Sequence, residues 1–209
     1  MPSQALREMS EVDVSVVGAV FMHAFTQPSV SKPHVVGSSF EDILSFIEEC
    51  RGRGLSESHI QDQLMPMAKI GYLEGMQALL AAGADPNIKN KDDETALHFA
   101  AYAGHLQCVK ALLSKMSREA IDAKNQNGNT ALHRVFWTIQ CISKESIPGR
   151  LECVKALLEG GADPNLVDKK GQTALHCAAM EGHALCVKIL LPKMSREAID
   201  AKNQNGNTA

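Results

Sequence analysis

The stretch TALHFAAYAGHLQCVKALL, residues 95–113, decides the fold of this chain. It returns with few changes at residues 173–191 as TALHCAAMEGHALCVKILL, and in an interrupted form at residues 130–158. A fainter copy, without the Thr-x-Leu-His start, ends at Leu80. Self-similarity at a nearly fixed period is the sequence signature of stacked repeats. The recurrence predicts a solenoid and, with it, a surface that binds other proteins.

Each full copy predicts a pair of short antiparallel helices. In the clearest copy, apolar residues at helical spacing flank Gly104, which turns the chain. Two amphipathic helices of this length cannot bury their apolar faces alone, so neighbouring copies must stack to complete a core. Aromatic residues make up only 4% of the chain, so that core must consist of Ala, Leu, Val, Met and Cys. This composition suits closely packed helices better than a β-sandwich.

A longer period overlies the first. KMSREAIDAKNQNGNTA occurs at residues 115–131 and 193–209, and GADPN occurs at residues 83–87 and 161–165. Both pairs are 78 positions apart, which indicates a tandem duplication of a two-repeat unit. The glycine of GADPN supplies a helix stop with positive φ. The longer KMSREAID junction lacks glycine, so we expect the helix before it to continue by up to one turn.

These motifs resemble the ankyrin repeat over residues 62–209, about 70% of the chain. The resemblance implies an all-α ankyrin-repeat solenoid of about four helix–turn–helix repeats joined by finger hairpins. It also implies a protein partner, bound on the concave and finger surface, and a role as an adaptor, scaffold or inhibitor. We expect repeats at residues 62–94, 95–129, 130–172 with an insertion near 137–148, and 173–207. A truncated fifth repeat follows, which indicates a fragment, a truncated reading frame or a recently trimmed gene.

The region before the repeats is less regular. Residues 1–36 predict a poorly ordered segment, because Pro28 and Pro33 interrupt any regular element. Residues 37–61 predict a helical N-terminal cap that covers the open end of the stack. A second helix start at Ser58 leads into a segment that contains Pro66, where we expect an irregular or kinked helix.

Histidines and cysteines in the repeats suggest structure rather than chemistry. The ankyrin resemblance gives His98, His133 and His176 a hydrogen bond to the signature threonine and another to the neighbouring finger. Cysteine recurs at one phase of the repeat, as expected for small buried thiols in a reducing compartment. His176 and Cys177 are adjacent on a helix and so cannot face each other as a nucleophile pair. We expect no catalytic residue, no cofactor and no metal site.

The resemblance places partner binding on the finger tips and the exposed face of the first helices. These positions are Lys91, Asp92, Glu94 and Tyr102 in the second repeat, Gln126, Asn127, Asn129, Arg134 and Trp137 in the third, and Lys169, Lys170, Gln172, Met180 and Glu181 in the fourth. Trp, Tyr and Arg are common hot-spot residues, so Tyr102, Arg134 and Trp137 are the predicted anchors. Two alternatives stay open: Trp137 packs under the insertion, and the charged fingers are only a solvated edge.

The net charge of −3 gives no general attraction to nucleic acid or to anionic membranes. We expect a cytoplasmic monomer with neither of these as a partner. Near-identical repeats with GADPN junctions also resemble ankyrin proteins that intracellular bacteria deliver into the host cytoplasm. Two other functions remain open: the chain is the targeting arm of an enzyme whose catalytic domain lies beyond residue 209, or residues 1–60 carry an activity that the repeats only direct.

Overall fold

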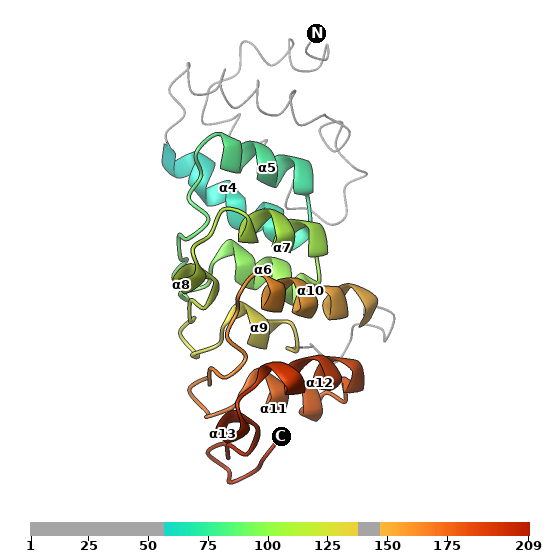
Figure 1. Cartoon of the computed structure of the whole chain (residues 1–209). Coiled ribbons are helices and arrows are strands. Elements are labelled where there is room, and N and C mark those ends of the chain that lie inside the picture. Colours follow the sequence, from blue (N-terminus) through green and yellow to red (C-terminus); the bar gives the residue numbers. More distant parts are fainter. Residues whose placement is uncertain (1–56, 138–146) are drawn as a thin grey trace, which may run out of the picture. The chain divides into compact units, whose positions relative to one another are not determined.

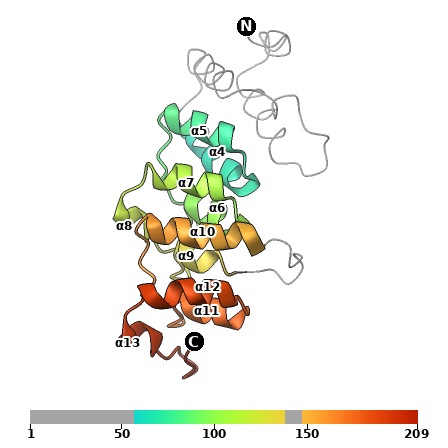
Figure 2. The same cartoon turned by 45° about the vertical axis from the view of Figure 1, so that its right-hand side comes forward.

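The computed structural model describes residues 57–137 and 147–209 of the chain (Figures 1 and 2). The predicted N-terminal segment, most of the predicted cap and most of the insertion lie outside these described residues. Within them the regular structure is helical, and one isolated antiparallel bridge between Val167 and Thr173 stands in place of strands. The chain divides into two compact units, residues 1–85 and 86–209.

The described part of the first unit is a pair of contacting helices, α4 (Glu57–Ile70) and α5 (Leu73–Ala81). Gly71, with φ of 76°, makes the turn between them, nine residues before Leu80 as Gly104 is nine residues before Leu113. Helix α4 is continuous through Pro66 and crosses the boundary expected between cap and repeats at residues 61 and 62. The last residues assigned to the cap therefore belong to the first helix of the first repeat.

The second unit contains three stacked helix pairs. Their helices are α6 (Ala96–Ala103) with α7 (Leu106–Leu113), α9 (Ala131–Arg134) with α10 (Ile147–Glu159), and α11 (Ala174–Met180) with α12 (Ala184–Leu190). The first helices α6, α9 and α11 contact one another in that order, and so do the second helices α7, α10 and α12 (Figure 1). This arrangement confirms the predicted solenoid.

The core of the second unit consists of small and aliphatic side chains from both helix layers. Leu97, Val109, Leu112, Leu132 and Leu157 are all buried. The repeat-phase cysteines 108, 153 and 186 are buried and form no disulfide, which confirms that they pack as small hydrophobes. None of the helices in the described ranges is both long enough and apolar enough to cross a bilayer.

The first KMSREAID junction differs from the prediction, whereas at the second a 3₁₀ turn continues the preceding helix α12. Helix α7 ends at Leu113, and a separate short helix, α8 (Arg118–Ile121), follows it. The Ser117 hydroxyl accepts a hydrogen bond from the Ala120 N–H at 3.3 Å, so it caps a new helix instead of continuing the old one. The second copy forms a 3₁₀ turn, η4 (Leu191–Lys193), and then α13 (Arg196–Ile199).

The two junction types are joined by hydrogen bonds between repeats. The Asp163 N–H of the second GADPN motif donates to Asp122 Oδ1 at 2.9 Å, in the KMSREAID junction before it. The Ser195 N–H of the following KMSREAID junction donates to Asn165 Oδ1 at 2.7 Å. The second GADPN motif thus bonds to the KMSREAID junctions on both sides of it, which gives the alternation of junction types a structural basis.

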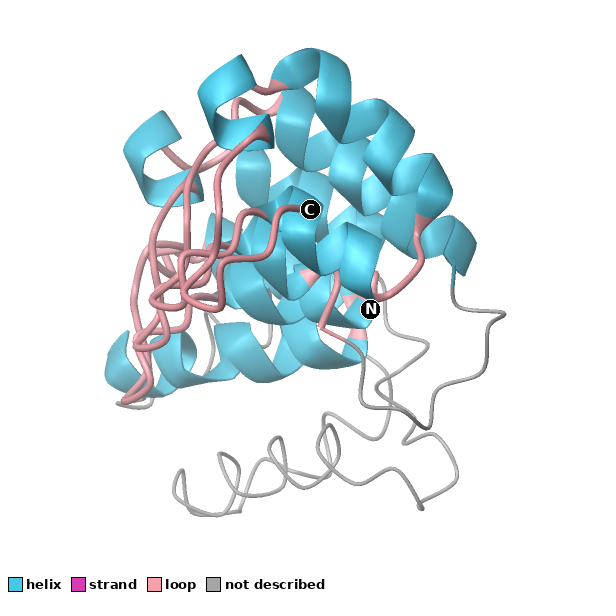
Figure 3. Cartoon of the chain, turned by 90° about the horizontal axis from the view of Figure 1, so that it is seen from below, coloured by secondary structure: helices cyan, strands magenta, loops and turns pink. Residues whose placement is uncertain are grey.

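The fingers are tight turns rather than strand hairpins, and an Asn or Asp side chain closes each one. Its Oδ1 accepts the backbone N–H groups two and four residues later, at 2.8–3.1 Å; these residues are Asn90, Asn125, Asp168 and Asn203. The loops that carry the fingers gather on one side of the helix pairs (Figure 3). The sequence analysis missed this closing residue, although it recurs five positions before each signature threonine.

Backbone hydrogen bonds link the finger tips into a ladder. The Gln126 N–H donates to the Asp92 carbonyl at 3.0 Å, and the Lys169 N–H donates to the Asn127 carbonyl at 3.0 Å. Gly128 lies at the second contact with φ of 78°, and a Cβ there would be 2.7 Å from the Lys169 nitrogen. Gly171 has the equivalent position in the next finger with φ of 72°, but a Cβ there would be 3.4 Å from its nearest neighbour, the Asn203 Cα.

These two glycines give a matched pair of variants. Gly171→Ala should lower the free energy of unfolding by about 1–2 kcal/mol, the cost of a left-handed residue with a side chain. Gly128→Ala adds a steric conflict with backbone atoms and should cost at least about 1 kcal/mol more. Urea unfolding followed by circular dichroism measures both. Equal losses in the two variants would contradict the close approach of the fingers.

Candidate partner-binding surface

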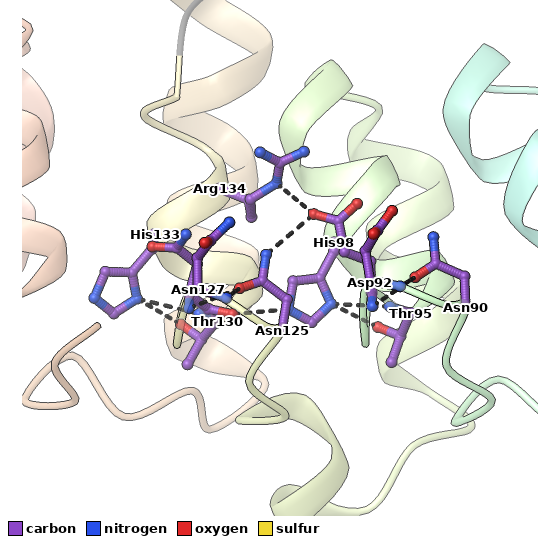
Figure 4. A network of polar contacts seen from close by, with 11 residues as sticks. Asn90, Asp92, Thr95, His98, Asn125, Asn127, Thr130, His133 and Arg134 are labelled. Atoms are coloured by element: carbon purple, nitrogen blue, oxygen red, sulfur yellow. Dashed lines mark hydrogen bonds and ion pairs between the residues drawn. The ribbon is translucent and has the colours of Figure 1, made fainter. Parts of the chain in front are cut away.

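A threonine–histidine pair at the start of each first helix fixes one repeat to the next. The Thr95 N–H donates to His98 Nδ1 at 3.1 Å, so Nδ1 is an unprotonated acceptor. Nε2 therefore carries the proton, which it donates to the Asn129 carbonyl of the next finger at 3.0 Å. His133 repeats the arrangement with Thr130 (Figure 4), and its Nε2 reaches the carbonyl of Gln172 at 3.0 Å.

The two bonds confirm the structural role expected for these histidines, and the electrostatics agree with it. Burial lowers the pKa of His98 to about 4 and also lowers the pKa of His133, because the charged imidazolium would be desolvated. His176 donates to the Asn207 carbonyl at 3.2 Å and accepts from the Thr173 N–H at 3.2 Å. Both of its ring nitrogens are thus engaged, and neither serves the neighbouring Cys177.

Arg134 of α9 gathers the predicted anchors into one cluster. Its guanidinium carbon lies 4.7 Å from the ring centroid of Tyr102 and 5.5 Å from that of Trp137. Its Nε is 3.1 Å from Glu94 Oε1, which also accepts from the Asn125 side-chain amide at 3.1 Å. A cation held over two aromatic rings is favoured electrostatically, so Arg134 fixes the orientation of both rings.

Repeat equivalence extends this cluster into a stripe across the first helices. Tyr102, Trp137 and Met180 each lie seven residues after a signature threonine. We call these three residues, together with Arg134, the first-helix stripe. Trp137 is 44% exposed and Met180 is 69% exposed, so the stripe offers a large apolar area to a partner.

A pocket of about 190 Å³ lies beside Trp137, between α9 and α11. Six of the predicted binding residues line it: Asn129, Trp137, Lys170, Gln172, Met180 and Glu181. The pocket therefore joins the exposed end of the stripe to the base of a finger.

The remaining predicted residues separate into exposed tips and buried supports. Exposed residues at or near the finger tips are Lys91, Asp92, Gln126, Asn127, Lys169 and Lys170. Glu94 and Asn129 differ from the expectation of an exposed face, since both are buried. Glu94 is held inside by Arg134, and the backbone of Asn129 is held by the bond from His98. Their side chains shape the surface from beneath.

The open alternative that places Trp137 under the insertion concerns residues 138–146, which lie outside the described residues. Burial raises the pKa of the Cys177 thiol to about 12, because the charged thiolate would be desolvated. Within residues 57–137 and 147–209, no three His, Cys, Asp or Glu side chains gather as a metal site requires.

Comparison with known proteins agrees with the geometry. A model of ankyrin repeats, described as three copies, matches residues 64–141 and 139–209. The chain is 29% identical over 168 residues to the E3 ubiquitin-protein ligase KEG of Arabidopsis thaliana, and 35% identical over 147 residues to the probable E3 ubiquitin-protein ligase XBOS31 of rice. It is 27% identical over 150 residues to the NF-kappa-B inhibitor cactus of Drosophila melanogaster.

These matches cover 80%, 67% and 63% of the chain, but only 9%, 30% and 30% of the three relatives. The homologues are thus larger proteins in which similar repeats form one part. Ankyrin repeats are generally protein-binding modules, and it is this part of the relatives that the chain resembles.

The neutral histidines predict how stability depends on pH. The unfolded chain takes up a proton on each histidine near pH 6.5, whereas folded His98 does so only near pH 4. The unfolded state therefore binds more protons in this window, and stability falls as the pH falls, by at most about 1.4 kcal/mol per pH unit for each such histidine. Urea unfolding at pH 7, 6 and 5 should show the decline.

The variant His98→Ala isolates this contribution. At pH 7 it should be less stable by about 1–3 kcal/mol, because the partners of the imidazole stay buried without their hydrogen bonds. Between pH 7 and 5 its stability should also decline less steeply than that of the wild type. Identical pH slopes, or unchanged stability at pH 7, would show that His98 does not hold the stack.

Proposed function

The chain belongs to the ankyrin-repeat family, and we propose that it binds a partner protein on the first-helix stripe and the finger tips. The observation that carries the proposal is the Tyr102–Arg134–Trp137 cluster. Three side chains of the types most enriched in binding hot spots meet there on one face. The ion pair with Glu94 holds them in place before any partner arrives, which lowers the entropy cost of binding.

The role that fits this surface is that of an adaptor, a scaffold or an inhibitor, without enzymatic activity of its own. Support comes from the groups that could have carried chemistry. His98, His133 and His176 are engaged in bonds that hold the repeats together, and burial raises the pKa of Cys177. We also propose a cytoplasmic location, in keeping with the free buried cysteines. Service as a bacterial effector in a host cell stays a prediction from the GADPN-rich repeats.

A second candidate is the targeting arm of a longer enzyme. Two of the relatives are named as E3 ubiquitin-protein ligases, and the chain matches only 9% and 30% of their length. In this case the stripe would select the protein on which a separate catalytic domain acts. The gene sequence beyond codon 209 distinguishes the candidates, since a catalytic domain encoded there would support the targeting arm.

The double variant Tyr102→Ala with Trp137→Ala tests the binding surface. Loss of two hot-spot side chains should weaken partner capture at least about 30-fold, which corresponds to 2 kcal/mol. Capture from cell lysate by the immobilised full chain, quantified by mass spectrometry, measures the effect. The far-ultraviolet circular dichroism should not change, because both residues are at least partly exposed.

Leu185→Ala is the matched control. Leu185 is an exposed apolar residue on α12, a second helix, and lies outside the stripe. Proteins captured by the wild type and by this control but lost from the double variant would support the proposal. If the double variant captures the same proteins as the wild type, the partner does not bind on the stripe.

A further inference from the structure

The pocket between α9 and α11 occupies a place that an arginine fills one repeat earlier. Four residues after the signature threonine, the third repeat has Arg134 and the fourth has Cys177. The earlier junction is closed by the Arg134 guanidinium, which lies over Tyr102 and pairs with Glu94. At the later junction a thiol takes the place of the guanidinium, and the pocket is lined by Cys177.

The wall of this pocket contains a buried amide without a hydrogen-bond partner. Asn129 takes the position that Glu94 has one repeat earlier, and only 2% of it is exposed. Its Nδ2 has no partner among the described residues, whereas Glu94 pairs with both Arg134 and Asn125. A buried polar group left unpaired costs about 1–3 kcal/mol. A guanidinium offers donors alone, so it can bond to this amide only through Oδ1.

The other residues that line the pocket determine which kind of ligand it can bind. By repeat equivalence, Trp137 lies beside the pocket as Tyr102 lies beside Arg134, and Met180 lies beside the pocket as Trp137 lies beside Arg134. The carboxylates of Asp168 and Glu181 outnumber the single cation of Lys170 in the lining. An indole ring together with a net negative charge favours a planar cation over an anion or a neutral group.

We propose that this pocket binds an arginine side chain of the partner protein, in the place that Arg134 holds one repeat earlier. The proposal rests on the proposed function, because the arginine belongs to the protein bound on the stripe. Its guanidinium stacks on Trp137 and donates to the carboxylates of Asp168 and Glu181. Rotation of the Asn129 amide by 180° would present its Oδ1 to the guanidinium as a further acceptor.

Trp137 is the only tryptophan in the chain, so its fluorescence reports on the pocket directly. The probes are acetyl-Gly-Arg-Gly-amide and the same peptide with citrulline, lysine or glutamate in the middle, each titrated into the full chain. The arginine peptide should give a saturable change with a dissociation constant on the order of 1 mM. Citrulline has nearly the same shape without the charge and should bind at least tenfold more weakly.

Lysine should bind more weakly than arginine because it lacks the planar fork, and glutamate should not bind. A titration with no saturable change for the arginine peptide would overturn the proposal. So would equal binding of the citrulline or lysine peptide, or tighter binding of the glutamate peptide.

Two sets of variants locate the effect. Glu181→Gln removes an exposed charge from the pocket and should weaken the arginine peptide several-fold, whereas Glu197→Gln removes an exposed charge from α13 and should leave the affinity unchanged. The pair Asn129→Glu with Cys177→Arg recreates the Glu94–Arg134 arrangement inside the pocket and should abolish binding with unchanged circular dichroism. Equal effects of the two glutamate variants would place the arginine elsewhere.

The outcomes of this test and of the lysate capture are separable. If capture depends on Tyr102 and Trp137 but the arginine peptide does not bind, the stripe binds a protein and the assignment of the pocket is wrong. In the opposite case, the arginine peptide binds and Glu181→Gln weakens its binding, but the Tyr102→Ala, Trp137→Ala variant captures the same proteins as the wild type. The pocket then binds arginine, and the stripe is not the face that binds the partner protein.

Discussion

The hydrogen bond from each signature histidine to the backbone of the next finger is the constraint on which the repeats depend. The threonine N–H uses Nδ1 as an acceptor, so the proton must reside on Nε2, and a buried N–H then requires a carbonyl. That carbonyl belongs to the residue directly before the next threonine, Asn129 after His98 and Gln172 after His133. Each bond therefore sets the position at which the next first helix starts, and the neutral imidazole makes the register sensitive to acid.

A fixed register brings equivalent positions of successive first helices side by side. Specificity can then arise from substitution at those positions alone, without change in the scaffold. The third repeat shows this most clearly: Arg134 bridges Tyr102 of the repeat before it and Trp137 of its own, while Glu94 holds it from below. One repeat later the bridging position is Cys177, and the space is left as a pocket. The two junctions share a backbone and differ in what they offer a partner.

The alternating junctions show how a two-repeat unit can be duplicated without loss of fit. Asp163 and Asn165 of one GADPN motif bond to Asp122 on one side and Ser195 on the other. A two-repeat unit contains one GADPN junction and one KMSREAID junction. When the unit is duplicated, the junction at the end of one copy can therefore bond to the junction at the start of the next. The finger ladder adds a second set of contacts, in which backbone N–H groups and the side chains of Gln126 and Gln204 donate to carbonyls of the preceding finger. At Gly128 the neighbouring finger also leaves no space for a Cβ.

The sequence by itself determined the helix pairs, the glycine turn at residue 104, the role of the histidines and the burial of the repeat-phase cysteines. The role of the histidines followed from the resemblance to ankyrin repeats, and the other features follow from periodic patterns that each repeat carries locally. The sequence also predicted Tyr102, Arg134 and Trp137 as anchors, but only the tertiary structure showed that Arg134 contacts the rings of the other two. It alone decided that Glu94 and Asn129 are buried, that Ser117 starts a separate helix, and that a pocket opens beside Trp137. Those features depend on the side chains that face each other across a repeat junction, and a pattern read along one chain does not contain that pairing.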